Sequence, residues 1–327
     1  MSLDRRAFLS ITALTVAATL AGGGVLAADK PKEIGLDYAY YNPVSLVLKE
    51  KGWVEEEFAK DGIGVRWVLS LGSNKALEYL NGRSIDFGST AGGAALLGRI
   101  NGNPIKSVYV YSRPEWTALV TRIDSPIQSV EELKGKRIAV TRGTDPYIFL
   151  IRALAGAGLG EKDVQIVLLQ HPDGKTALER GDVDAWSGLD PHMAQTEIEG
   201  KSRLFYRDPD ANTWGVLNVR EEFAAEHPDL VERLIAVYER GRAWAIENPD
   251  ELRRILAKNA KLTDEVAARQ LERTDLSHSA IGAAQRESIL AAGEALKSVG
   301  IVPADVDITV ATDALLEPAF TKRLAGN

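Results

Sequence analysis

The feature that most constrains the fold is a repeated alternation of short apolar segments with amphipathic segments. Residues Glu33–Tyr38, Val65–Ser70 and Ile85–Gly88 have the composition of strands, and the segments between them place apolar residues at helical spacing. A strand that follows a helix returns to the sheet in the same direction as the strand before it. The pattern therefore predicts an α/β fold in which a mainly parallel sheet is flanked by helices.

The alternation occurs in two blocks, residues 32–116 and 117–215, and no flexible linker separates them. Residues 221–298 change character and are almost wholly helical in pattern. We therefore expect two lobes joined by two hinge strands that bend near 113–118 and 215–219. The predicted boundaries are 29–116 plus 217–327 for lobe 1 with its helical tail, and 117–216 for lobe 2.

The N-terminus has the pattern of an export signal. Arg5 and Arg6 precede an uncharged run from Ala7 to Ala28 that ends in small residues. The arginine pair is typical of the twin-arginine route, so residues 1–28 predict a periplasmic protein. A retained membrane anchor is the alternative, because the run is long enough to span a bilayer. The chain has no Cys, which excludes a lipid-anchored lipoprotein.

Composition narrows the partners and the chemistry. The net charge of −7 disfavours nucleic acid as a partner. The absence of Cys excludes disulfides, thiolate metal sites and Cys nucleophiles. The 4 His residues have no metal-ligand spacing. We therefore expect neither a metal nor another cofactor.

Three loops share one design, in which small polar residues follow a strand and directly precede a helix. They span 70–74, 88–92 and 141–145. A helix N-terminus has free N–H groups and a positive dipole end, so it binds anions, and such loops lie at the carboxyl edge of the sheet. Each loop alone is more typical of an ordinary helix cap. Together they predict an anion site whose candidate residues are Gly72, Ser73, Ser89, Thr90, Gly143, Thr144 and Asp145.

Aromatic and polar residues near the same sheet edges are candidates for the cleft wall. Tyr40, Tyr41 and Asn42 follow the first strand, and Trp214 lies at the junction after the second block. Core packing is the alternative for each aromatic side chain. Trp186 and Asp190 are the corresponding candidates in the second lobe.

Signatures of catalysis and of metal binding fail on inspection. Gly174-Lys175-Thr176 lacks the glycine five positions earlier that a phosphate loop requires, and no Gly-x-Ser-x-Gly sequence occurs. Asp182 and Asp190 lie at opposite ends of one predicted strand, so they cannot easily converge on a metal. We therefore predict no catalytic residues.

Several motifs resemble one family. The runs LNGRSIDFGST (80–90) and LKGKRIAV (133–140), the latter followed by Gly143-Thr144, resemble signatures of the aliphatic sulfonate-binding proteins of ABC importers. GDVDAW (181–186), AW (243–244) and NPDE (248–251) extend the resemblance through the second lobe and the tail. The resemblance covers most of 32–320, and it is specific at the level of the sulfonate, taurine and nitrate group.

The resemblance implies a two-lobed periplasmic binding protein of the second structural type. Its ligand would be a small organic anion, above all an aliphatic sulfonate, delivered to a membrane permease with a cytoplasmic ATPase. We expect a monomer. The backbone amides of Ser89-Thr90 and Gly143-Thr144 would clamp the anion from both lobes, and the organic part would be covered by Tyr40, Tyr41, Trp186 and Trp214.

Two alternatives remain open at this point. The same fold could bind nitrate, taurine, a pyrimidine or an aromatic carboxylate. An enzyme on this fold would need a general base in the cleft, for which Asp145 is the best candidate. Asp145 could instead pair with an ammonium group of a zwitterionic ligand, or cap its helix.

Overall fold

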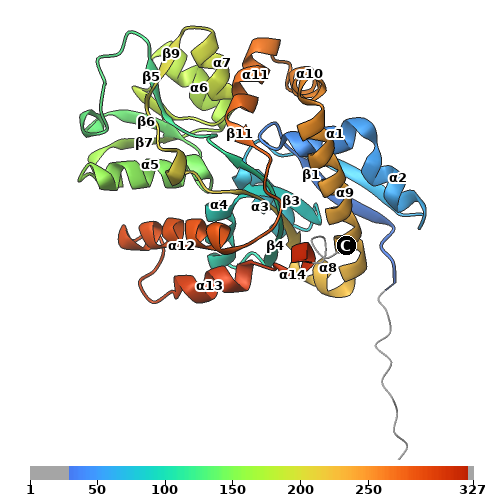
Figure 1. Cartoon of the computed structure of the whole chain (residues 1–327). Coiled ribbons are helices and arrows are strands. Elements are labelled where there is room, and N and C mark those ends of the chain that lie inside the picture. The colour runs from blue at the N-terminus through green and yellow to red at the C-terminus, as the bar shows by residue number, and fades with distance from the viewer. Residues whose placement is uncertain (1–28, 323–327) are drawn as a thin grey trace, which may run out of the picture.

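The chain forms two lobes, each built on its own sheet (Figure 1). The computed structural model describes residues 29–322, so the predicted export signal at 1–28 lies outside the described residues. Within that part of the chain, no helix is long and apolar enough to cross a membrane. The α/β class and the two-lobed architecture predicted from the sequence are confirmed.

The lobe 1 sheet has six strands in the order β11-β4-β10-β3-β1-β2. Strands β1 to β4 run in one direction, whereas β10 lies antiparallel between β3 and β4. The edge strand β11 is antiparallel to β4 as well, so the sheet is parallel only from β3 through β1 to β2. The strands are β1 (Glu33–Tyr38), β2 (Gly64–Leu69), β3 (Phe87–Ala91), β4 (Ile105–Pro114), β10 (Gly215–Arg220) and β11 (Thr274–Asp275).

The helices of lobe 1 connect these strands. The predicted break near Gly52 is present, because this glycine has the left-handed φ of 67° and ends one helix where the next begins. Later helices begin at the carboxyl ends of β2 and β3. The helices are α1 (Pro43–Lys51), α2 (Trp53–Ala59), α3 (Ser73–Asn81) and α4 (Gly92–Ile100).

The lobe 2 sheet has five strands in the order β7-β6-β8-β5-β9. It repeats the design of lobe 1, since β5, the first strand after the crossing, lies antiparallel between β8 and β9. The sequence did not anticipate α7 and β9. The mixed polarity of β9 gives no periodic signal, and its place is set by pairing with β5. The elements are β5 (Leu119–Arg122), β6 (Arg137–Val140), β7 (Gln165–Leu168), β8 (Ala185–Ser187), β9 (Ser202–Tyr206), α5 (Asp145–Gly156), α6 (His171–Arg180) and α7 (His192–Ile198).

The helical tail touches both lobes. Helix α9 packs on α1, and α12 and α13 pack on α4, all in lobe 1. Helix α11 also lies against α7, and α12 against α5, so the tail reaches lobe 2 as well (Figure 1). Its helices are α8 (Glu221–Glu226), α9 (Pro228–Glu247), α10 (Pro249–Ala260), α11 (Asp264–Glu272), α12 (Ala283–Ser298), α13 (Ile308–Leu315) and α14 (Ala319–Lys322).

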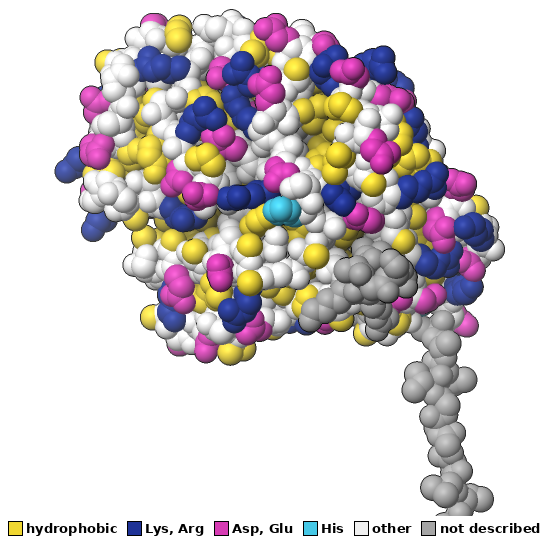
Figure 2. All heavy atoms as spheres, in the orientation of Figure 1, with side chains coloured by type: hydrophobic (Ala, Val, Ile, Leu, Met, Phe, Trp, Pro, Cys, Tyr) yellow, Lys and Arg dark blue, Asp and Glu magenta, His cyan; other side chains and the backbone are white. Residues whose placement is uncertain are grey.

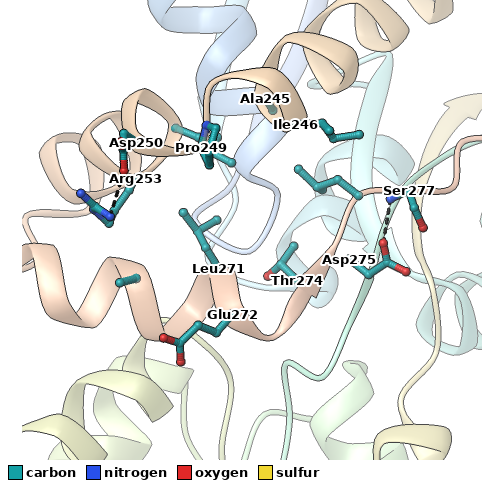
Figure 3. Close-up of a pocket in the computed structure, with 13 residues that line it drawn as sticks. Ala245, Ile246, Pro249, Asp250, Arg253, Leu271, Glu272, Thr274, Asp275 and Ser277 are labelled. Atoms are coloured by element: carbon teal, nitrogen blue, oxygen red, sulfur yellow. Dashed lines mark hydrogen bonds and ion pairs between the residues drawn. The ribbon is translucent and has the colours of Figure 1, made fainter.

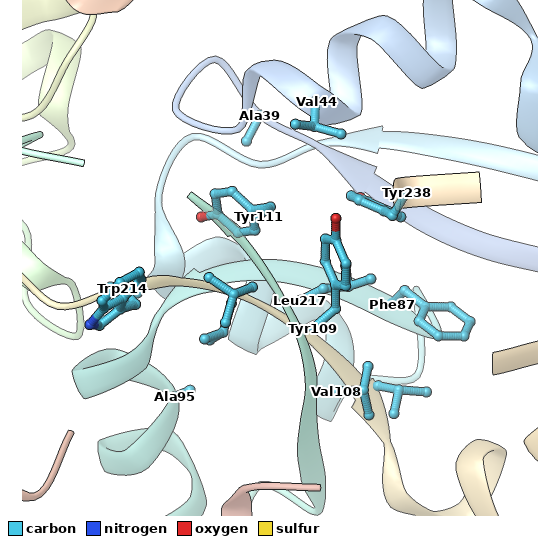
Figure 4. Close-up of a cluster of buried hydrophobic side chains, with 14 of the residues drawn as sticks. Ala39, Val44, Phe87, Ala95, Val108, Tyr109, Tyr111, Trp214, Leu217 and Tyr238 are labelled. Carbon is cyan, nitrogen blue, oxygen red and sulfur yellow. The ribbon is translucent and has the colours of Figure 1, made fainter. Parts of the chain in front are cut away.

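Aromatic side chains form the centre of the lobe 1 core (Figure 4). The rings of Tyr109 and Tyr238 lie 5.7 Å apart, and the Tyr109 hydroxyl donates to the Glu239 carboxylate at 2.8 Å. Lobe 2 has separate clusters around Phe149 and Trp186. Because each lobe has its own close-packed interior, relative motion of the lobes concentrates in the two crossing segments.

Candidate ligand-binding site between the lobes

Residues of both lobes and of the first crossing segment meet around a small enclosed cavity. Its volume is about 10 Å³, room for about one water molecule. A ligand larger than water therefore enters only when the lobes part. The cavity is lined by Tyr41, Ser73, Trp116, Thr144, Asp145, Pro146 and Leu189.

Two of the three predicted anion loops face each other across this cavity. Helix α3 begins at Ser73 and helix α5 begins at Asp145, and neither N-terminus receives a side-chain cap. A β-carbon built on Gly143 would lie 3.6 Å from the β-carbon of Asn74, so the two loops are in contact. Two positive dipole ends from different lobes thus converge on one small space, which favours an anion between them.

The remaining predicted loop is occupied by protein groups. The Gly92 N–H at the start of α4 donates to the Trp214 carbonyl at 2.8 Å, and the Gly93 N–H donates to Thr213 Oγ1 at 3.1 Å. Thr90 lies within β3, and its hydroxyl oxygen accepts from Asn218 Nδ2 at 2.8 Å. The second crossing segment therefore covers this helix end in the closed structure.

The polar groups of Ser89 also have protein partners in this structure, and its expected contact with an anion stays a prediction. Its N–H and hydroxyl both donate to Asp37 Oδ1, at 2.8 and 2.9 Å. Asn42 Nδ2 donates to the Ser89 hydroxyl at 2.7 Å, and the Tyr41 hydroxyl donates to the Ser89 carbonyl at 3.0 Å. Burial raises the pKa of Asp37 to about 7, although these hydrogen bonds oppose the shift. The network fixes Tyr41 at the cavity.

Asp145 joins the two crossing segments to lobe 2. Its carboxylate accepts from Trp116 Nε1 at 2.9 Å, from the Thr213 N–H at 2.9 Å and from the Thr213 hydroxyl at 2.7 Å. Burial raises the pKa of Asp145, and the three hydrogen bonds oppose the shift. Its lone pairs point to protein donors, and its side chain does not cap α5. Asp145 is therefore a structural acceptor in this closed structure.

Asp190 belongs to a second contact between the lobes. Its Oδ1 accepts from the Ala194 N–H at 2.8 Å, and its Oδ2 lies 3.6 Å from Arg273 Nη1 in the tail. Arg273 also pairs with Glu197 of α7. Burial raises the pKa of Asp190 to about 7, because desolvation outweighs the attraction of Arg273. This ion-pair cluster holds the tail against lobe 2.

The other predicted wall residues lie away from the cavity lining. Trp186 is fully buried in a lobe 2 core cluster, with its ring against Gly174. Trp214 stacks on His278 with ring centroids 5.1 Å apart. Tyr40 is half-buried, and its carbonyl accepts from Gln270 Nε2 at 2.6 Å. A β-carbon on Gly72 would meet His171 of lobe 2, so this glycine lies at the contact between the lobes.

Sequence reasoning missed several residues at the site. Trp116 makes a wall of the cavity, and its ring lies edge-on to Tyr41 at 5.9 Å. The signal that could have identified Trp116 is its position in a segment that crosses between the lobes. Pro146 and Leu189 also line the cavity, and no pattern distinguishes them from core residues.

The described part of the chain also has larger surface hollows, none of them lined by the residues of this cavity. A pocket of about 490 Å³ lies between α10, α11 and β11 (Figure 3). Its charged groups already have partners, since Arg253 pairs with Asp250 at 3.2 Å and Asp275 accepts from the Ser277 N–H at 2.7 Å. The pocket therefore lacks the convergent free donors of the site between the lobes.

Charge on the surface is mixed. Lys and Arg side chains are interspersed with Asp and Glu over the face shown in Figure 2. Within residues 29–322, no group of three or more His, Cys, Asp or Glu side chains could hold a metal ion. Recognition of an anion would therefore rest on local donors at the cleft.

Comparison with known proteins gives the family. The family model described as NMT1/THI5 like matches residues 44–252, more than half of the chain. The chain belongs to the NMT1/THI5-like family. A Bacillus subtilis (strain 168) relative that carries the name of an aliphatic sulfonates-binding protein is 30% identical over 272 residues, covering 81% of this chain and 82% of the relative.

Solved structures agree on the fold of this NMT1/THI5-like chain. The alkanesulfonate-binding protein SsuA from Xanthomonas axonopodis pv. citri, solved bound to MOPS, superposes with a TM-score of 0.80 at 22% identity, covering 89% of this chain and 99% of that one. The periplasmic aliphatic sulphonate binding protein SsuA from Escherichia coli gives 0.74 at 24%, covering 88% and 93%. These relatives are binding proteins, not enzymes, and the prediction that this chain is a binding protein is confirmed.

Proposed function

We propose that this protein is the solute-binding component of an ABC importer, and that it captures a small organic sulfonate between its lobes. The observation that carries the proposal is the convergence of two uncapped helix N-termini, α3 from lobe 1 and α5 from lobe 2, on one enclosed space. The family membership and the names of the relatives support the same class of ligand.

The residues at the cavity divide the recognition between charge and shape. Backbone N–H groups at Ser73 and Thr144 would hold the sulfonate oxygens, because both lie at positive dipole ends. The edge-on rings of Tyr41 and Trp116, with Leu189, would cover the organic part. Asp145 is the one charged residue in the lining. Its carboxylate already accepts three hydrogen bonds from the protein, so we assign it no contact with the ligand. Asp145 thus keeps the crossing segments in place.

Closure is the step that would report the bound ligand to the membrane. The sulfonate would contact both lobes, so it would stabilise the closed arrangement by its differential affinity. The closed form buries Asp190 and Arg273 between the tail and lobe 2. A permease paired with a cytoplasmic ATPase would then distinguish loaded from empty protein by shape.

Thermal unfolding in the presence of a ligand panel tests this function. The panel contains alkanesulfonates, taurine, nitrate, a pyrimidine and aromatic carboxylates. A ligand at about 100 times its dissociation constant adds about 2.7 kcal/mol to the free energy of unfolding. A shift with sulfonates is the expected result. A shift with nitrate, a pyrimidine or carboxylates alone would reject the sulfonate and leave the binding role.

Export through a twin-arginine-like signal completes the proposal. Arg5 and Arg6 are the residues that carry it. Replacing both by Lys keeps the charge, and is expected to leave the protein in the cytoplasm when cell fractions are compared. Unchanged periplasmic recovery would contradict the proposed route. Recovery of the parent chain in the membrane fraction would favour an anchor.

A further inference from the structure

Two hydrogen-bond acceptors without partners meet where lobe 2 touches the N-terminus of α3. His171 is fully buried, and its Nε2 has no hydrogen-bond partner. The side-chain Oδ1 of Asn74 is also buried without a partner. A β-carbon built on Gly72 would lie 2.9 Å from His171 Nε2 and 2.8 Å from Asn74 Oδ1. The two atoms therefore face the same point, from opposite lobes.

The hydrogen bonds around His171 fix which of its nitrogens is the acceptor. The Thr141 hydroxyl donates its single proton to the Leu169 carbonyl at 2.7 Å. The 3.3 Å contact between Thr141 Oγ1 and His171 Nδ1 must then be donated by Nδ1. Burial lowers the pKa of His171 to about 3, so the ring is neutral, and Nε2 carries a lone pair. The tautomer is thus assigned from the hydrogen-bond network.

A buried acceptor without a partner is unfavourable, and here two such acceptors lie together. A sulfonate oxygen has no proton and would be repelled by both. An ammonium or a primary amide has at least two N–H donors and would satisfy both acceptors, whereas a hydroxyl has one proton and would satisfy one of them. Gly72 is the neighbour of Ser73, which lines the cavity. A ligand larger than water parts the lobes, and this motion would open room for such a group beside Gly72.

We propose that His171 and Asn74 read a hydrogen-bond donor on the ligand, so the preferred ligand is a short amino- or hydroxyalkanesulfonate. This inference rests on the proposed function. The sulfonate end lies at the start of α5, and the contact of Gly143 with Asn74 places the donor end only a short chain away. A two-carbon spacer between sulfonate and donor fits this arrangement.

The experiment compares matched ligands by titration calorimetry. Propane-1-sulfonate and 2-hydroxyethanesulfonate have the same shape and differ in one methyl-to-hydroxyl exchange, and taurine carries an ammonium there. The parent protein is expected to bind the two donor-bearing ligands about tenfold more tightly than propane-1-sulfonate, the value of one well-placed hydrogen bond.

Two variants and one control locate the effect. His171→Asn keeps a donor at the Nδ1 position but does not reach the Nε2 position, and Asn74→Ala removes the second acceptor from the other lobe. Each is expected to weaken the binding of taurine, whose ammonium uses both acceptors, and so to reduce its preference over propane-1-sulfonate, which binds as before. Thr176→Ala, on the exposed side of α6, is expected to keep the tenfold preference. Unfolding temperatures measured without ligand show whether each variant folds. If His171→Asn does not fold, Asn74→Ala alone tests the subsite.

The outcomes separate this inference from the proposed function. If the parent binds all three sulfonates equally, the donor subsite is refuted and the sulfonate role stands. If a preference exists but persists in both variants, the assignment to His171 and Asn74 is refuted. If no sulfonate binds, the proposed function fails and the inference fails with it.

Discussion

Thr213 offers the sharpest test of how the crossing segments hold the lobes. Its hydroxyl accepts from the Gly93 N–H of lobe 1 at 3.1 Å and donates to Asp145 Oδ1 of lobe 2 at 2.7 Å. Thr213→Val has nearly the same shape and removes both hydrogen bonds. It leaves the Gly93 N–H buried without this acceptor, and it removes one of the three donors to a buried carboxylate.

The expected magnitude follows from these two losses. An unsatisfied buried donor costs about 1–3 kcal/mol, and a hydrogen bond to a charged group is worth about 1.5–3 kcal/mol. Because the two losses share one network they do not add fully, and we expect Thr213→Val to lower the free energy of unfolding by about 3 kcal/mol. Thr213→Ser is the matched control, since it keeps the hydroxyl and loses one methyl, worth about 1 kcal/mol.

Urea unfolding gives the free energy of unfolding of both variants, and its pH dependence is a second test. Hydrogen bonds from neutral donors favour the ionised Asp145 carboxylate. Burial raises its folded-state pKa, so the carboxyl takes up its proton at a higher pH than a free Asp does, and the bond weakens as the pH falls. The difference between Thr213→Val and Thr213→Ser is therefore expected to be larger at pH 8 than at pH 4. Equal losses in the two variants, or a loss below about 1 kcal/mol in Thr213→Val, would refute the role of this network.

Three further predictions address other buried groups. In the folded state Asp37 has a pKa of about 7 against 3.8 unfolded, so its contribution favours folding at low pH and is lost as pH rises from about 4 to 7. Asp37→Asn should thus gain stability relative to the parent over that window, by at most about 1.4 kcal/mol per pH unit, and a flat difference in urea unfolding would contradict this. Trp186→Phe should leave the affinity for sulfonate unchanged in calorimetry, because the ring lies in the lobe 2 core. Weakened binding would show that Trp186 contributes to the ligand site. Arg273→Gln removes the partner of Asp190 and Glu197 and should cost about 3–5 kcal/mol in urea unfolding at pH 8. The cost should be smaller at pH 5, where Asp190 is protonated, and an equal cost at both values would contradict the pairing.

The sequence predicted the parts of the fold that have periodic signals. The alternation of strands and helices, the break at Gly52 and the two-lobed arrangement follow from local patterns. The strand β9 and the helix α7 did not, because tertiary pairing with β5 and contact with α11 place them. A short element of mixed polarity carries no period of its own.

The sequence predicted which loops lie at the site, but not which backbone and side-chain groups in those loops are free to bind a ligand. Three polar loops before helices pointed to the sheet edges that meet at the cleft. Which N–H groups stay free depends on distant residues: Asp37 occupies the Ser89 amide, and Trp214 and Thr213 cover the start of α4. Such long-range partners leave no trace in local spacing. His171 was visible only as one of four scattered histidines, and its place opposite Gly72 follows from how the lobes meet.

A crystal structure of the protein with propane-1-sulfonate would decide whether α3 and α5 hold a sulfonate between the lobes. We expect sulfonate oxygens at about 3 Å from the backbone N–H groups of Ser73 and Thr144, with the alkyl chain against Tyr41 and Trp116. A sulfonate bound at the start of α4 beside Ser89 and Thr90, or in the surface pocket between α10 and α11, would contradict it.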